Sequence, residues 1–229
     1  MTTLATASTT GPAASTGTPT GEPRYATAYR YTDRETKARY IAEKYAPILH
    51  GSVLDVGCDK APLRALVASP SRYTGVDMAP GSDIVLNLDA SPLPLANRSY
   101  DTVVCTDVLE HLERCHGVFD ELCRVANGHV VVSLPNPVRC LLDALRDGAK
   151  GRLKYYGLPS QPPPDRHRWF FGAEDARAFV ETGAARNGFD VEQMDFESVG
   201  NLSWIVNGTD VMDSLNLRLG TMWAVLRRA

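Results

Sequence analysis

The chain has 229 residues, 44% of them hydrophobic, and a net charge of −3 with an isoelectric point near 6.0. This length and hydrophobic fraction predict one globular domain. The slight negative charge and the scattered arginines exclude the basic surface that nucleic-acid binding requires. The expected partner is therefore a small molecule or a neutral glycan, and no nucleic acid.

Cysteine usage and hydropathy predict the compartment. The five cysteines are odd in number and never form Cys-x-x-Cys, which argues against a zinc cluster and against a disulfide framework. No apolar run approaches the roughly 20 residues of a membrane span, and the first residues lack the basic and apolar regions of a secretion signal. These features predict a cytoplasmic protein with reduced thiols and no membrane span. They leave the oligomeric state unknown.

The first predicted elements are a tail and a helix. Residues 1–22 are almost wholly Thr, Ala, Ser, Gly and Pro, which predicts a disordered tail before one folded domain at 23–229. A helix is predicted after a cap at Thr32 or Asp33, because apolar residues in 40–49 recur at helical spacing. The residues just before it either close over a ligand or pack on the domain: Tyr25, Tyr29, Arg30 and Tyr31.

The first predicted strand and its turn are the centre of the fold. Apolar and β-branched residues up to Val56 predict a short buried strand, Gly57 predicts a sharp turn, and a helix is expected to begin near Pro62. In a dinucleotide-binding turn, glycines and backbone N–H groups face a pyrophosphate. Here Asp55 and Asp59 would repel that anion and attract a cation. The turn therefore favours a ligand with an ammonium or sulfonium group.

A second acidic residue extends this site. Asp77 follows Gly57 by 20 residues and ends the next apolar run, 73–76. An acid at the tip of the second strand is where a doubly wound fold binds the two hydroxyls of a ribose. One site thus offers acids to a ribose and to a cationic group. S-adenosylmethionine carries both, and we expect it as the cofactor.

Four sequence blocks follow one another in a defined order. They are Val-Leu-Asp-Val-Gly-Cys at 53–58, Tyr-Thr-Gly-Val-Asp at 73–77, the segment 93–112 with Asp-Val-Leu-Glu-His at its end, and Val-Val-Val-Ser-Leu-Pro-Asn at 130–136. In this order they resemble the class I S-adenosylmethionine-dependent methyltransferases, of the type 11-like group that acts on small molecules and sugars. The resemblance covers the chain from about residue 36 onward. It implies an α/β, Rossmann-like domain with a seven-stranded mixed sheet.

The resemblance also implies the cofactor contacts. They are the ribose at Asp77, the adenine ring on Met78, the adenine amino group at Asp89 with backbone from Ala90, and the methionine end at Asp55, Gly57, Cys58 and Thr106. For Asp89 the alternative is a turn residue that heads the following loop.

One departure from the family lies in the first turn. The usual Gly-x-Gly-x-Gly reads Gly57-Cys58-Asp59-Lys60-Ala61, so two glycines are missing. Asp59 either reshapes the loop or binds the amino group of the methionine part with its carboxylate. A methyltransferase-like binding or regulatory protein without turnover stays an alternative. A nicotinamide-dependent oxidoreductase is disfavoured, because Asp59 would repel the pyrophosphate.

Two histidines are the candidate catalytic residues. The predicted fourth strand, 102–105, runs into a long helix with His111 in its first turn, and His167 lies in the loop 157–171. An imidazole has an ordinary pKa near 6.5, and a general base contributes about 10²- to 10⁴-fold to a rate. Each histidine is a candidate base, with hydrogen bonding to backbone or anchoring of the loop as the alternative. Asp165 or Glu110 is the next candidate.

A metal is not expected. The pattern Asp107-x-x-Glu110-His111 resembles the Glu-x-x-Glu-His metal site of some O-methyltransferases that act on quinone precursors or RNA ends. It differs in its first residue, however, and many relatives with Asp-Val-Leu-Glu-His use no metal. The prediction is therefore no metal, with this set left open.

The rest of the chain completes the sheet and contacts the acceptor. The predicted fifth strand, 130–134, precedes a helix at 138–153 and the proline-rich substrate loop 157–171. The remaining elements are a helix at 173–187, a strand at 189–197, a short helix or flap at 199–219, and a strand at 221–226 that the family inserts antiparallel between the fifth and sixth. The loop and the missing basic patch favour a hydroxyl of a sugar or natural product as acceptor. Methylation at carbon or nitrogen stays open.

Overall fold

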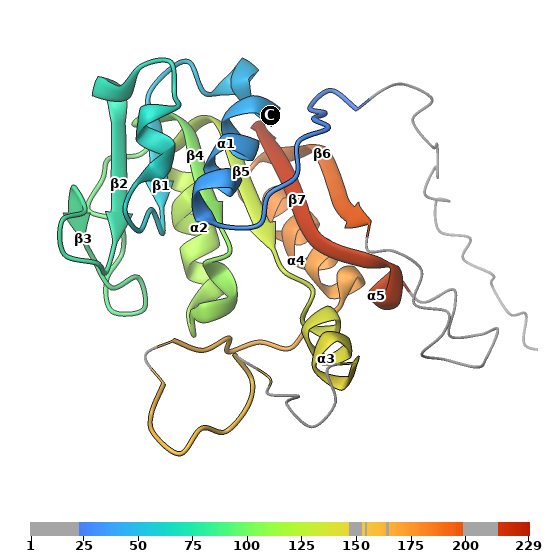
Figure 1. The fold of residues 1–229 in the computed structure, drawn as a ribbon. Coiled ribbons are helices and arrows are strands. Elements are labelled where there is room, and N and C mark those ends of the chain that lie inside the picture. Colours follow the sequence, from blue (N-terminus) through green and yellow to red (C-terminus); the bar gives the residue numbers. More distant parts are fainter. Residues whose placement is uncertain (1–22, 147–152, 154, 164, 199–214) are drawn as a thin grey trace, which may run out of the picture.

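The structure is a computed structural model that describes residues 23–146, 153, 155–163, 165–198 and 215–229 (Figure 1). Seven strands form one sheet in the order β3-β2-β1-β4-β5-β7-β6. They are β1 (Val53–Val56), β2 (Tyr73–Asp77), β3 (Ile84–Val85), β4 (Tyr100–Thr106), β5 (Ala126–Leu134), β6 (Phe189–Ser198) and β7 (Leu219–Arg228). The first five pair in parallel, and β7 runs antiparallel to both β5 and β6. The predicted mixed sheet and the inserted last strand are confirmed.

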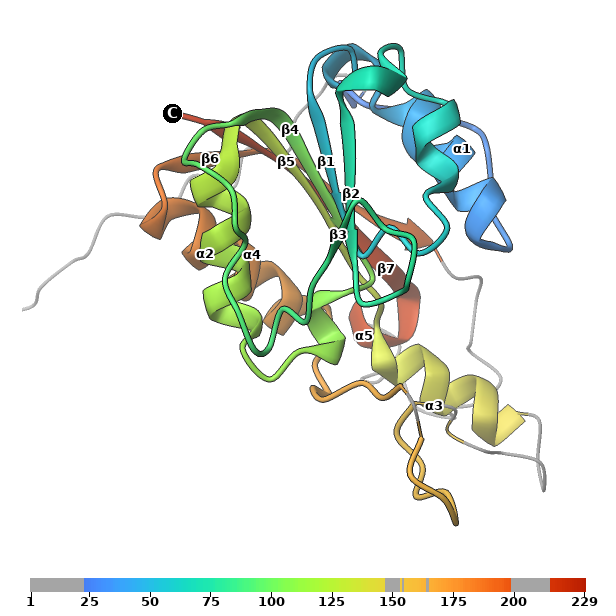
Figure 2. The ribbon, with the colours of Figure 1, turned by 90° about the vertical axis from the view of Figure 1, so that its left-hand side faces the viewer.

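Helices cover both faces of the sheet. They are α1 (Arg34–Lys44), α2 (Cys115–Val125), α3 (Pro137–Arg146), α4 (Ala173–Arg186) and α5 (Leu215–Arg218). Figure 2 shows α1 on one face and α2 with α4 on the other. Helix α3 and the segment 155–171 lie beyond the end of the sheet at which β5 ends. That end is where a doubly wound fold binds its ligands.

The core is divided by the sheet into two layers. On β4, Val103 and Cys105 belong to the layer under α2 and α4, whereas Val104 belongs to the layer under α1. This alternation follows from the two-residue period of a strand. The two layers bury residues 102–105 of this strand, none of which is more than 1% exposed, as a central parallel strand requires.

Helix α1 begins as predicted, with an aromatic layer beneath it. Asp33 caps the helix by accepting from the backbone N–H of Thr36 at 2.8 Å, in a reciprocal capping box. Upstream, Tyr25 is 1% exposed. The Tyr31 ring centroid lies 5.9 Å from that of Trp223 on β7. These tyrosines therefore pack on the domain, which is one of the two interpretations of the segment before α1.

Two predicted helices are shorter than expected. The helix from Pro62 is a single 3₁₀ turn, Pro62–Ala65, and little chain is left before the next turn begins at Pro70. The long helix after β4 is interrupted: a 3₁₀ turn, Leu109–His111, ends at Leu112, whose backbone is extended, and α2 begins only at Cys115. The predictions were wrong here because an apolar period of three to four residues fits both helix types over one turn.

Some predictions fall outside the described residues. These are the tail at 1–22, residues 147–152 of the helix predicted at 138–153, and the part of the predicted flap at 199–214. Among the residues that the structure does describe, none of the helices combines the length and the apolar character needed to cross a membrane.

Candidate functional site

The turn after β1 keeps the backbone that glycines favour. Gly57 has φ +81°, and a Cβ there would lie 2.2 Å from Cγ2 of Val108, so only glycine fits. Asp59 and Ala61 stand where two family glycines are missing, yet they have φ values of 49° and 52°. The left-handed backbone is therefore retained without glycine, although this conformation is energetically unfavourable for residues with a Cβ.

Three of the predicted carboxylates meet at this turn. Asp55 is 8% exposed and accepts a hydrogen bond from the Tyr73 hydroxyl. Burial raises the pKa of Asp55 to about 6. Asp77 accepts from the backbone N–H of Asp59 at 2.8 Å and of Ala79 at 2.9 Å. The predicted ribose acid thus also fixes the turn after β1.

Helix α1 supplies cations that the sequence reasoning missed. Arg34 lies 2.7 Å from the Asp59 carboxylate, and Lys37 lies 2.6 Å from that of Asp107. The hydroxyl of Ser133 donates to the other oxygen of Asp107 at 2.6 Å. Helical spacing could have indicated Lys37, because it precedes the buried residues Ile41 and Lys44 of α1 by one and two turns. The acids at 55, 59, 77 and 107 are called the acidic site below.

The acidic site retains the charge that the sequence predicts. Four carboxylates meet two cationic side chains, so a net negative charge remains when all are ionised. A ligand with hydroxyls and a positive group fits such a site. The residues present therefore fit S-adenosylmethionine.

The other predicted cofactor residues lie around this end of the sheet. Met78 follows Asp77 and is 64% exposed, and its packing on an adenine ring stays a prediction. Thr106 ends β4, half-buried and in register with Ser133 of β5. The Cys58 thiol is buried against Gly75, where a Cβ would come within 2.6 Å of Sγ. The thiol therefore packs inside the protein, and the contact of Cys58 with the cofactor stays a prediction.

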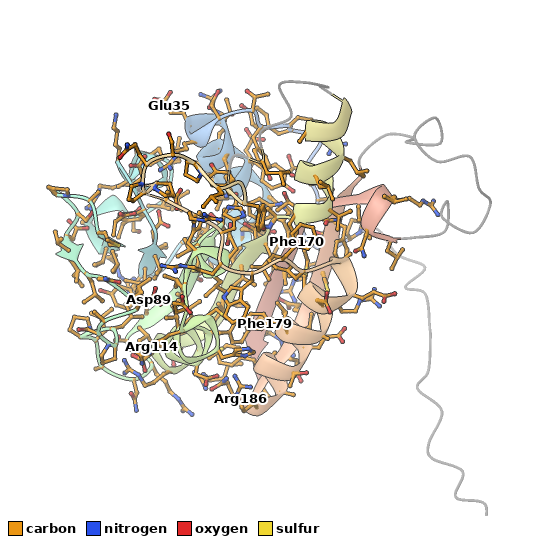
Figure 3. The ribbon with its side chains drawn as sticks, turned by 90° about the horizontal axis from the view of Figure 1, so that it is seen from below. Glu35, Asp89, Arg114, Phe170, Phe179 and Arg186 are labelled. Atoms are coloured by element: carbon orange, nitrogen blue, oxygen red, sulfur yellow. The ribbon has the colours of Figure 1, made fainter. Side chains whose placement is uncertain are left out.

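Asp89 and Ala90 lie near the start of α2. A carboxylate oxygen of Asp89 accepts from the backbone N–H of Arg114 at 3.0 Å, just before α2 begins. Figure 3 shows the two residues side by side. The backbone N–H of Ala90 donates to the Asn87 carbonyl at 3.0 Å. Asp89 is thus a structural anchor here, and its contact with adenine stays a prediction.

The two candidate catalytic histidines are brought together. The ring centroids of His111 and His167 lie 4.5 Å apart, nearly perpendicular. Nδ1 of His111 lies 2.6 Å from a carboxylate oxygen of Asp165 and 3.2 Å from the Arg166 carbonyl. Nδ1 of His167 lies 3.1 Å from the Tyr156 hydroxyl. The sequence identified each histidine separately, and the structure joins them.

Glu110 completes this group. It is 1% exposed, and Oε1 lies 3.7 Å from Nε2 of His111. Burial raises the pKa of Glu110 well above its usual range. Glu110, His111, Asp165 and His167 are called the histidine cluster below. Asp107 is not part of it, because Lys37 and Ser133 hold that carboxylate.

The segment 165–171 fastens the cluster to the domain. The backbone N–H of Arg168 donates to the Glu110 carbonyl at 2.7 Å, and the indole N–H of Trp169 donates to the Leu112 carbonyl at 2.7 Å. A cavity of about 230 Å³ lies beneath, between this segment, α2 and α4. Its wall is largely apolar and includes Leu109, Glu110, Leu134, Trp169, Phe171 and Phe179.

Comparison with known proteins agrees with this architecture. A family model described as a methyltransferase domain matches residues 29–193. No curated protein sequence is a significant match. Similar solved structures include a SAM-dependent methyltransferase from Archaeoglobus fulgidus, with 17% identity, 86% of this chain and 95% of that chain covered, and a TM-score of 0.56.

Two further structures show the range of this fold. Magnesium protoporphyrin IX methyltransferase from Synechocystis PCC 6803, with bound SAH, is 15% identical over 85% of this chain and 83% of its own, with a TM-score of 0.53. The cyclase SpnF is 15% identical over 85% and 81%, with a TM-score of 0.52. At these identities the likeness concerns the fold. The family match covers most of the chain, which therefore belongs to the methyltransferase domain family and is a class I, S-adenosylmethionine-dependent methyltransferase.

Proposed function

We propose that this enzyme methylates a hydroxyl group of a small molecule, either a sugar or a natural product. The observation that carries the proposal is the pairing of His111 with His167, since His111 follows Asp107 of the acidic site by four residues. The cofactor supplies an electrophilic methyl carbon on a positive sulfur. A hydroxyl oxygen must lose its proton to attack that carbon, so a group that accepts the proton must lie nearby. A carbon or nitrogen acceptor does not always need such a group.

The hydrogen bonds of His111 suit it to this task. With a proton on Nδ1, the ring donates to Asp165, and the opposite nitrogen, Nε2, then carries a lone pair. Asp165 thereby fixes both the tautomer and the orientation of the ring. The acceptor hydroxyl would lose its proton at this cluster.

The surroundings favour a small acceptor with an apolar part. The cavity next to Glu110 has room for a ring or a short aliphatic group, and its wall is mainly aromatic and aliphatic. The net charge of −3 disfavours a nucleic acid. The proline-rich segment 157–171 approaches the histidine cluster through His167 and Asp165, which supports its predicted role as a substrate loop.

The same proposal includes a cytoplasmic location. All four cysteines in the described part of the chain for which burial is given are free and buried: Cys58, Cys105, Cys115 and Cys123. Free thiols are typical of a reducing compartment.

An acceptor screen tests the proposal. The full chain is incubated with methyl-labelled S-adenosylmethionine and a panel of phenols, sugars and hydroxylated polycyclic compounds, each paired with its amine analogue. We expect S-adenosylhomocysteine to form with a hydroxylated member, and NMR to show the label in an O-methyl group. Label on nitrogen or carbon would contradict the hydroxyl assignment. Tight cofactor binding without turnover on any member would favour the regulatory alternative.

A further inference from the structure

The carboxylate of Glu110 is buried without a hydrogen-bond partner. Both of its oxygens are inaccessible, and neither has a partner among the described residues. A buried polar group left in this way is costly, and a carboxylate more so than a neutral group. The arrangement therefore calls for a group that binds these oxygens.

Two imidazoles lie close to this carboxylate. Glu110, His111 and His167 each offer one ligand atom, and these atoms all lie within 4.8 Å of one another. Nitrogen and oxygen ligands around a bound zinc ion lie roughly 3 to 3.5 Å apart, given metal–ligand distances of about 2.0–2.2 Å. Side-chain rotations that move the ligand atoms by about an ångström would bring them to the spacing found around a metal ion.

Each imidazole is also oriented as a ligand would be. Metal-binding histidines usually hold their second ring nitrogen to a carboxylate, a carbonyl or another polar group. Here Nδ1 of His111 is held by Asp165 at 2.6 Å, and Nδ1 of His167 by the Tyr156 hydroxyl at 3.1 Å. Nε2 of His111 then faces Glu110 with a lone pair, 3.7 Å from Oε1.

We propose that Glu110, His111 and His167 bind one divalent transition-metal ion, of the zinc, manganese or iron class. Two imidazoles and one carboxylate suit these ions, and three protein ligands leave a coordination position open. This set is not the one that the sequence pattern offers, because Asp107 is held by Lys37 and Ser133 and His167 takes its place.

The role of the ion rests on the proposed function. An acceptor hydroxyl at the open position would have a lowered pKa, so the O–H bond would break and the proton would pass to solvent. The oxygen lone pair would then form the bond to the methyl carbon. The carbon–sulfur bond would break, with its electron pair left on sulfur. In this scheme the histidines act as ligands and not as bases.

Calorimetric titration of the metal-depleted full chain with zinc chloride, and separately with manganese chloride, tests the site. We expect one ion per chain with at least one of the two metals. Glu110→Gln, which keeps the side-chain volume, should weaken binding at least about tenfold. Asp165→Asn should weaken it about 10- to 100-fold by releasing the His111 ring. Because Asp165 is exposed, this second variant tests the site even if a change at Glu110 prevents folding.

Two control variants define the result. His50→Ala should leave the metal affinity unchanged, and Asp107→Asn should change it much less than Glu110→Gln does. Absence of binding by both metals in protein that still binds S-adenosylhomocysteine would overturn the proposal, as would equal affinity in the Glu110 and Asp165 variants. Affinity lost only in Asp107→Asn would assign the metal to the other set. Because no acceptor is present, failure here leaves hydroxyl methylation standing with an imidazole as base, and failure of the acceptor screen leaves the metal result intact.

Discussion

The acidic site and the histidine cluster lie at the same end of the sheet but are built in different ways. The acidic site comes from the ends of adjacent strands, and its carboxylates are held by backbone N–H groups, a tyrosine or a cation. The histidine cluster joins two segments about 55 residues apart and contains a buried carboxylate with no hydrogen bond. The polar groups of the acidic site already have partners in the protein. The buried carboxylate of the histidine cluster has none, and an unsatisfied group of this kind requires an explanation such as a bound ion.

The sharpest way to separate the two regions is to remove the imidazole of His111. His111→Ala should lower kcat by about 10²- to 10⁴-fold, while the Kd for S-adenosylhomocysteine stays within a factor of about two. Steady-state kinetics with the acceptor found in the screen, together with calorimetry, measure both quantities. His50→Ala is the matched control, because His50 is exposed and lies before β1, at the other end of that strand. If His111→Ala lost affinity for S-adenosylhomocysteine instead, the histidine cluster would not be separate in function from the acidic site.

The buried acid of the acidic site should make stability depend on pH. The native pKa of Asp55 is about 6 and its ordinary value is 3.8, so between these values the native state binds more protons than the unfolded state. The free energy of unfolding therefore falls as pH rises from about 4 to 6, and the loss, up to about 3 kcal/mol, persists above pH 6.

Asp55→Asn should remove this part of the pH dependence. Denaturant unfolding at pH 4.5 and pH 8 should show the variant gaining stability relative to the parent chain at pH 8 and little at pH 4.5. The same variant should bind the cofactor more weakly, since the site loses a negative charge. Parallel pH profiles for the two proteins would contradict the assignment.

Asp77→Ala should affect the cofactor and spare the chemistry. The apparent KM for S-adenosylmethionine should rise at least about tenfold, because one charged hydrogen bond is worth about 1.5–3 kcal/mol. The variant also loses the acceptor for the Asp59 N–H, so Asp77→Asn, which keeps an acceptor oxygen, is the matched control. An unchanged KM would remove Asp77 from the ribose contact.

The smallest expected effect concerns the backbone of the first turn. Ala61→Gly should stabilise the protein by about 1 kcal/mol, because glycine adopts a φ of 52° without the penalty of a Cβ. Ala65→Gly, in the neighbouring 3₁₀ turn, should instead destabilise by about 0.5–1 kcal/mol. Denaturant midpoints measure both. Changes of equal sign would show that strain is not what distinguishes Ala61.

What could be predicted from the sequence follows the same division. The strand order, the turn at Gly57 and the acids at 55 and 77 were predictable, because each depends on residues close in sequence and on a parallel sheet that gathers strand ends. Lys37 was missed because a charged residue is normally expected on the solvent-facing side of a helix, whereas Lys37 contacts Asp107 from the inner side of α1. The interruption at Leu112 was missed because one turn of 3₁₀ and of α helix share an apolar spacing.

The histidine cluster could be predicted only in part. His111 and His167 were identified as residues of the correct type, but their contact depends on the path of the segment 165–171, which two long-range hydrogen bonds to the Leu109–His111 turn and Leu112 define. No periodicity encodes such a path. Tyr156, which holds His167, had no sequence signal at all.

The aromatic layer under α1 has a consequence for how the protein is made. Trp223 lies between Tyr31, Tyr40 and Tyr45, so the helix that carries Arg34 and Lys37 rests on the strand translated last among those described. A nascent chain that lacks β7 therefore lacks one part of the surface on which α1 packs, the other part being buried residues of β1, β4 and β5. A product truncated before β7 would therefore hold α1 less firmly, and with it the contacts of Arg34 and Lys37 with the acids at 59 and 107.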